Sequence, residues 1–168
     1  GILNSDDTFF NTEVIEVLAN FHQQNDLDAS VGNIVQHSAE GKLLRIYSAK
    51  NWSPQKLKIG FMPPHPSIFF KRELFEKLGY YHLDFVISAD YELIVRFFLK
   101  HKIIWKYSGI TTTTMLVGGL SSSGYKSYQL ISQEIVKALR GNRILFSPFK
   151  VRLRGFWKLV GLFNKSKI

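Results

Sequence analysis

The sequence contains no cysteine, so disulfides, thiolate metal sites and a cysteine nucleophile are excluded. It does not open with a basic segment followed by an apolar one, and we therefore expect no secretory signal. Residues 107–125 carry no charge, but this stretch is rich in Gly, Ser and Thr and does not resemble a membrane-spanning helix. We expect a chain that folds in water and does not cross a membrane.

Acidic residues are nearly absent from the C-terminal quarter. Residues 1–124 hold 12 Lys/Arg and 12 Asp/Glu, whereas residues 125–168 hold ten Lys/Arg and only Glu134. The whole net charge of +9 therefore belongs to the last 44 residues. Such asymmetry indicates a polyanionic partner, either membrane lipid or nucleic acid.

The order of apolar patterns and turn signals predicts alternating strands and helices. Residues 2–5 are typical of the end of a buried strand, and Asn11 or Thr12 offers the N-cap of a helix that runs to about His22. The further expected elements are a hairpin (29–38 and 43–48), a proline-rich loop (51–66), a strand and helix ending at Gly79 (67–81), a helix (88–102), two strands (103–107 and 109–117) and a helix (125–140). This mixture predicts an α/β or α+β sheet domain over 1–124, followed by basic helices over 125–168.

The C-terminal segment 146–167 combines an apolar stripe with a basic one. The apolar stripe consists of Phe149, Leu153, Phe156, Val160 and Phe163, and the basic one of Lys150, Arg154 and Lys158. An amphipathic helix of this kind is typical of a bilayer interface. The alternative is a helix packed on the domain with a solvated basic face. The apolar stripe argues against nucleic acid, since phosphate contacts do not require it.

Asp6 and Asp7 are the first candidates for chemistry. Two carboxylates at a strand end suit a hard divalent cation such as Mg²⁺ or Mn²⁺, held together with substrate phosphates. The alternative is that one acid caps the following helix.

Other candidates lie further along the chain. Asp90 could cap its helix or act as a general base presented at a rigid helix terminus. His65, between prolines, could bind a substrate hydroxyl or phosphate or be purely structural. The segment 118–124, "GGLSSSG", offers backbone N–H groups and hydroxyls, as phosphate loops do, but lacks the lysine and spacing of a P-loop.

Taken in order, three stretches resemble the family 2 glycosyltransferases of the GT-A fold, in particular the bacterial branch that builds capsule, O-antigen and exopolysaccharide chains. They are "LNSDDTFF", "MPPHPSIFFKRELFEKLGYYHLDFVISADYELIVRFF" and "GGLSSSG". The resemblance covers residues 3 to about 140 and implies a mixed sheet flanked by helices. It implies an inverting transfer of a sugar from a nucleotide donor, most simply UDP-linked, to a glycan or lipid-linked acceptor. The expected location is the cytoplasmic face of the membrane.

The resemblance also assigns roles to residues. It places metal and donor diphosphate binding on Asp7 first and Asp6 second, and the catalytic base on Asp90. It puts His65 and Ser67 near the acceptor pocket and matches the loop carrying Gly118, Gly119 and Ser121 to the one that follows the sheet in this branch.

The sequence departs from the family pattern in three respects. Only Gly1 to Asn4 precede the acidic pair, where the family has a nucleotide-binding half of about three βα units. We therefore expect an N-terminally truncated chain that could be inactive alone. There is no "QxxRW" motif of processive synthases, and no histidine after His101 to serve as a late metal ligand. The rival hypotheses are a non-catalytic basic binding module and an inactive glycosyltransferase remnant.

Overall fold

A computed structural model describes residues 1–38, 40–116 and 124–155, without the side chains of 124–126. The chain divides into two compact units, each built from separate segments. The first unit contains residues 1–52, 63–80 and 101–123, and the second contains residues 53–62, 81–100 and 124–168. Among the described residues, no helix is both long and apolar enough to span a membrane.

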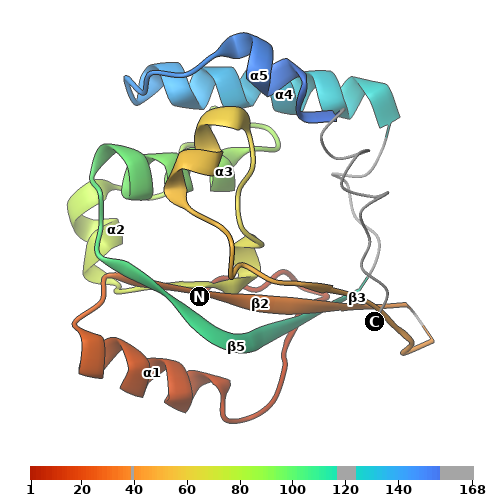
Figure 1. The fold of residues 1–168 in the computed structure, drawn as a ribbon, viewed down its shortest axis with the longest axis vertical. Helices are drawn as coiled ribbons and strands as arrows, with labels where there is room; N and C mark the ends of the chain where they lie inside the picture. The colour runs from red at the N-terminus through yellow and green to blue at the C-terminus, as the bar shows by residue number, and fades with distance from the viewer. Residues whose placement is uncertain (39, 117–123, 156–168) are drawn as a thin grey trace. The chain divides into compact units, whose positions relative to one another are not determined.

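The first unit is an α/β unit around a mixed five-stranded sheet (Figure 1). The strands are β1 (Thr8–Phe9), β2 (Ala29–His37), β3 (Leu43–Tyr47), β4 (Ile68–Phe70) and β5 (Trp105–Leu116). Their order is β1-β5-β2-β3, with β5 parallel to β2 and every other pair antiparallel. β4 and β3 share one edge of β2, because β4 pairs with Ala29–Val31 and β3 with Ile34–His37.

β2 is the centre of this sheet. Its residues from Ala29 to Val35 are all buried, so the strand shows no alternation of buried and exposed positions. Helix α1 (Val14–Asn25) packs along β2 and β5, with Val14 and Leu18 in a small core that includes Phe69. The short 3₁₀ turn η2 (His65–Ser67) also contacts both strands. A strand covered by other elements buries consecutive residues.

The outer strand β3 is different. Leu43, Leu44 and Ile46 are each about half exposed, at 46%, 49% and 50%. In the described part of the chain, β3 pairs only with β2. It is therefore an open edge that carries apolar side chains.

The second unit is helical. It contains the 3₁₀ turn η1 (Pro54–Ile59), α3 (Ala89–Val95), the π-helical turn η3 (Arg96–Lys100), α4 (Gly124–Gly141) and α5 (Pro148–Arg152). α3 packs against α4, and α4 against α5. A buried ion pair joins Glu92 and Arg96, 3.0 Å apart, and Asn142 donates to Glu92 Oε1 at 3.0 Å. The remaining helix, α2 (Glu73–Leu78), belongs to the first unit.

Several expectations are confirmed. The hairpin is β2 and β3, the strand and helix before Gly79 are β4 and α2, and the helix predicted from residue 125 is α4. The helix predicted over 88–102 begins as expected but widens into the π turn at Arg96. Ile94, Phe97 and Phe98 are buried in it.

Three expectations are wrong. Residues 2–5 form no strand, because they enter a turn that ends at Asp7, and β1 follows the acidic pair instead of preceding it. The two strands predicted over 103–117 are the single strand β5, which passes through Gly109 at a φ of +80°. The N-cap of α1 is Glu13, one to two residues later than predicted, and Asn11 Oδ1 accepts the Glu13 N–H at 3.1 Å.

The close approach of β2 and β5 depends on Gly32. A Cβ at this position would lie 2.7 Å from Thr112 Cγ2 and 2.9 Å from the Ile110 carbonyl oxygen. We expect Gly32→Ala to lower the free energy of unfolding by about 1–3 kcal/mol, because backbone atoms would have to move apart. Urea unfolding followed by circular dichroism measures the change.

The matched control is Gly141→Ala, since a Cβ there meets no atom within 4 Å. Its effect should stay below about 1 kcal/mol in either direction. Equal destabilisation by the two substitutions would contradict the steric role of Gly32.

Candidate functional site

The acidic pair lies in a tight turn ahead of β1. The Asp7 N–H donates to the Asn4 carbonyl at 3.1 Å and closes the turn over residues 4–7. Asp7 Oδ2 accepts two bonds from Asn4, from the side-chain amide at 2.9 Å and from the backbone N–H at 3.3 Å. Asp7 is thereby fixed in one orientation, with only 8% of its surface exposed. Asp6, in the middle of the turn, is exposed.

The second carboxylate oxygen of Asp7 is unusual. Oδ1 is buried and has no hydrogen-bond partner among the residues that the structure describes. A buried carboxylate oxygen that is left unsatisfied costs free energy, because it has lost water without gaining a donor. An oxygen of this kind fits a divalent cation, which takes carboxylate ligands and can bring its own water. Asp7 is therefore the residue that could hold a metal.

The turn carrying His65 and Ser67 contacts the same strand as β1. Phe9 pairs with Thr113 of β5, and the Thr113 hydroxyl donates to the Pro66 carbonyl at 2.9 Å. Thr113 is fully buried, so it links the two segments from within. The structure thus places the Asp7 turn and the His65 turn on one stretch of β5.

Ser67 and His65 differ in what they can offer. Ser67 is fully buried, and its hydroxyl donates to the Pro64 carbonyl at 2.7 Å. This bond holds the 3₁₀ turn, and it uses the hydroxyl hydrogen of Ser67 within the protein. His65 is partly exposed at the start of the same turn. Among the two, His65 is the candidate for contact with a substrate.

Asp90 belongs to the second unit, in the first turn of α3. Its Oδ1 accepts the Tyr91 N–H at 2.7 Å, whereas Ser88 occupies the N-cap position. Asp90 is partly exposed. Burial and the nearby charge of Asp90 raise the pKa of Tyr81 to about 12, so this phenol stays protonated beside the carboxylate at neutral pH.

Glu134 of α4 holds the segment that leads into α3. Its Oε1 accepts the N–H of Val86, and its Oε2 accepts those of Ile87 and Ser88 at 3.0 and 2.8 Å. Burial by itself would raise the pKa of Glu134, but the three backbone donors outweigh it and hold the pKa below its ordinary value. One buried carboxylate therefore fixes the backbone two residues before Asp90.

Some predicted residues cannot be placed. Gly118, Gly119 and Ser121 lie outside the described residues, as do Phe156 and the residues after it in the predicted interface helix. Within residues 1–38, 40–116 and 124–155, no three His, Asp or Glu side chains gather into a metal-binding group. A cation held by Asp7 would therefore take its other ligands from water or from a bound phosphate.

Neither a protein-family model nor a curated protein matches this chain. What the chain does is therefore inferred from its own residues.

Two contributors were missed by the sequence reasoning. Asn4 orients Asp7, and the "N-x-x-D" spacing of a side-chain-stabilised turn was the available signal. Glu134 is the one acid in the basic quarter of the chain. That isolation was a usable signal, because a lone acid among cations that is also buried has a specific partner.

Replacing Glu134 with Gln should destabilise the protein in a pH-dependent way. The folded-state pKa is lowered, so the charged carboxylate contributes stability above the ordinary value of 4.5, and this contribution is lost as the pH falls through the folded pKa. We expect Glu134→Gln to lower the free energy of unfolding by about 1–3 kcal/mol at pH 7. The difference in unfolding free energy between the variant and the wild type should narrow below pH 4.5. Thermal unfolding from pH 7 to 3 measures it.

The control is Glu76→Gln, because Glu76 is exposed on α2. Its effect should be within about 0.5 kcal/mol at every pH. A gap for Glu134→Gln that is constant between pH 7 and pH 3 would contradict the role of the charge.

Proposed function

We propose that this chain is part of an inverting glycosyltransferase of GT-A type that moves a sugar from a nucleotide donor, most simply UDP-linked, to a glycan or lipid-linked acceptor. The observation that carries the proposal is the buried, unpartnered Oδ1 of Asp7 at the entrance to β1. A cation bound to a diphosphate requires a carboxylate ligand that is held rigidly and has one oxygen not engaged in hydrogen bonds. The resemblance of the surrounding motifs to family 2 glycosyltransferases adds support.

In this proposal Asp90 is the general base. It accepts the proton of the acceptor hydroxyl while the hydroxyl oxygen bonds to the anomeric carbon. The bond from that carbon to the diphosphate oxygen breaks on the opposite face, which inverts the configuration. The Asp90 carboxylate suits this role because it is held by the Tyr91 N–H and lies on a helix start fixed by Glu134.

The other residues bind and orient. Asp7, with Asp6 beside it, would hold Mg²⁺ or Mn²⁺, which when bound supplies positive charge to the departing diphosphate. Ser67 fixes the turn that presents His65, and His65 donates to or accepts from a hydroxyl of the acceptor. We place the reaction at the cytoplasmic face of the membrane, with the enzyme bound peripherally.

Asp7→Asn should weaken cation binding. The substitution removes the charge at the buried oxygen while keeping the size of the side chain. We expect Mn²⁺ affinity in the presence of UDP-glucose to fall at least about tenfold, since even outer-sphere partners of metal ligands are worth that much. Electron paramagnetic resonance of unbound Mn²⁺ measures the affinity.

Asp26→Asn is the control, because Asp26 is exposed and pairs with Lys71 at 2.9 Å. It should leave the Mn²⁺ affinity unchanged. If Asp7→Asn also leaves it unchanged while the fold is intact, Asp7 is not a metal ligand.

Asp90→Asn should abolish transfer without abolishing donor binding. Loss of a general base lowers kcat by about 10²- to 10⁴-fold, whereas the Kd of the donor should change little. Incorporation of labelled sugar from a panel of UDP-sugars into membrane-extracted acceptors measures kcat, and donor titration measures Kd.

Asp84→Asn is the matched substitution in the same unit, at an exposed carboxylate paired with Lys137. It should retain activity. Both substitutions are therefore measured in a chain extended to include the expected nucleotide-binding half. Wild-type rates for Asp90→Asn in that chain would refute the base assignment, and absence of incorporation by the extended wild type from every donor would refute the proposed function.

A further inference from the structure

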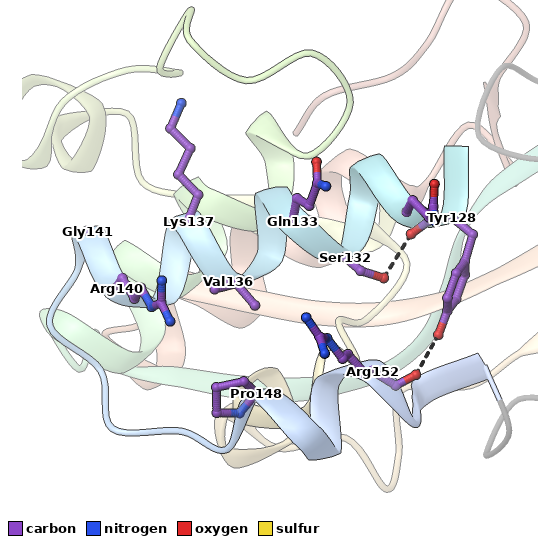
Figure 2. Close-up of a pocket in the computed structure, with 10 residues that line it drawn as sticks. Tyr128, Ser132, Gln133, Val136, Lys137, Arg140, Gly141, Pro148 and Arg152 are labelled. Atoms are coloured by element: carbon purple, nitrogen blue, oxygen red, sulfur yellow. Dashed lines mark hydrogen bonds between the residues drawn. The ribbon is translucent and has the colours of Figure 1, made fainter. Parts of the chain in front are cut away.

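A cavity in the second unit lies between α4 and α5 (Figure 2). Its volume is about 980 Å³. The lining includes Tyr128, Val136, Lys137, Arg140, Pro148 and Arg152. Tyr128 of α4 links this helix to α5 and the residues after it, because its hydroxyl donates to the Arg152 carbonyl at 2.9 Å and accepts the Gly155 N–H at 2.9 Å. The cavity is therefore bounded by hydrogen-bonded backbone.

The lining is positively charged and carries no carboxylate. Lys137 pairs with Asp84 at 2.5 Å, but Arg140 and Arg152 are exposed and have no ion pair among the described residues. Figure 2 shows the side chain of Arg152 in the space between the two helices, with that of Arg140 further along the same space. Two guanidinium groups in one cavity repel each other until an anion lies between them.

A third arginine, Arg154, adds positive charge next to the Tyr128 ring. Arg154 is only 4% exposed, its Nε has no hydrogen-bond partner in the described part of the chain, and its guanidinium carbon lies 5.3 Å from the centre of the Tyr128 ring. Burial lowers the pKa of Arg154, because desolvation disfavours the charged guanidinium. Tyr128 thus lines the cavity and also contacts a buried cation.

The cavity is also apolar in part. Val136, Pro148 and the Tyr128 ring line it together with the arginines. A site for a small phosphate ion needs only donors and charge, whereas an amphiphile needs a cationic pocket continuous with apolar surface. The excess of +9 over residues 125–168 favours an anionic surface as the source of that amphiphile.

We propose that the cavity between α4 and α5 binds the phosphate headgroup of an anionic phospholipid, with Arg140 and Arg152 as the phosphate ligands. Guanidinium groups suit this role because their forked N–H groups match phosphate oxygens in pairs. The proposal places a specific lipid contact on the described part of the basic region. It does not rest on sugar transfer, and its test uses no sugar donor.

The experiment is co-sedimentation of the full chain with phosphatidylcholine vesicles that contain phosphatidylglycerol. We expect the pair of substitutions Arg140→Gln and Arg152→Gln to weaken binding about tenfold or more, since each cation at a membrane surface contributes about 1 kcal/mol. The pair Arg140→Lys and Arg152→Lys keeps the charge but loses the paired geometry, and should cause a smaller loss. Both arginines are exposed, so the variants should unfold at the wild-type temperature.

The control removes the same charge elsewhere, through Lys50→Gln and Lys100→Gln, at two exposed lysines outside the cavity. It should weaken binding less than about threefold. Equal losses for the two Gln pairs would show diffuse attraction and overturn the proposal, as would failure of the wild type to bind anionic vesicles. Displacement of the protein from vesicles by millimolar glycerol phosphate would show a site for soluble phosphate and would also overturn it.

Discussion

The parallel pairing of β2 with β5 is the constraint on which the first unit depends. The pairing runs from Ala29 opposite Trp105 to His37 opposite Leu116, and therefore joins residues more than 70 positions apart. β5 then carries β1 on its other edge and binds the His65 turn through Thr113. A single long-range strand pair thus sets where the Asp7 turn and the His65 turn lie. Contacts between such distant residues form only after much chain entropy has been lost, so they form cooperatively.

Buried charge organises the second unit in a comparable way. Glu134 is satisfied by three backbone N–H groups, and Glu92 by Arg96 and Asn142. Among the described residues, two buried side-chain atoms have no partner, Asp7 Oδ1 and Arg154 Nε. Native proteins satisfy nearly all such atoms, so each exception requires an explanation. Here one exception lies in the proposed metal site, and the other lies next to Tyr128 of the proposed lipid site.

The sequence predicted local elements well and long-range relations poorly. The hairpin of β2 and β3, the helix ending at Gly79 and the helix carrying Asp90 follow from apolar periodicity and turn residues, which act over a few positions. The unbroken strand β5 was missed because Gly109, which looks like a strand end, is accommodated within the strand at positive φ. The strand expected before Asp7 was misplaced because the side chain of Asn4 forms a turn with it, and an apolar pattern does not report such a bond.

The same contrast holds for the candidate site. Asp7 and Asp90 could be selected from the sequence because they lie next to predicted elements. Two further properties depend on tertiary contacts: the unpartnered state of Asp7 Oδ1 among the described residues, and the support that Glu134 gives to the helix start carrying Asp90. The family resemblance places Ser67 near an acceptor pocket. In the structure its hydroxyl donates to the Pro64 carbonyl and closes a turn. Residue type and spacing identify which groups can do chemistry, and burial decides which of them remain accessible.

The open edge of the sheet has a consequence for the behaviour of the protein in concentrated solution. Within the described residues, the outer edge of β3 has no strand paired to it, and half-exposed Leu43, Leu44 and Ile46 lie on this strand; such an edge can add a strand from a second molecule. Molecules that each carry a net charge of +9 repel one another over roughly a Debye length, about 10 Å at 0.1 M salt. The repulsion that comes from the basic residues near the C-terminus therefore hinders pairing of β3 with a second molecule, without any direct contact to this strand. Added salt screens this repulsion, so low ionic strength favours the monomeric protein.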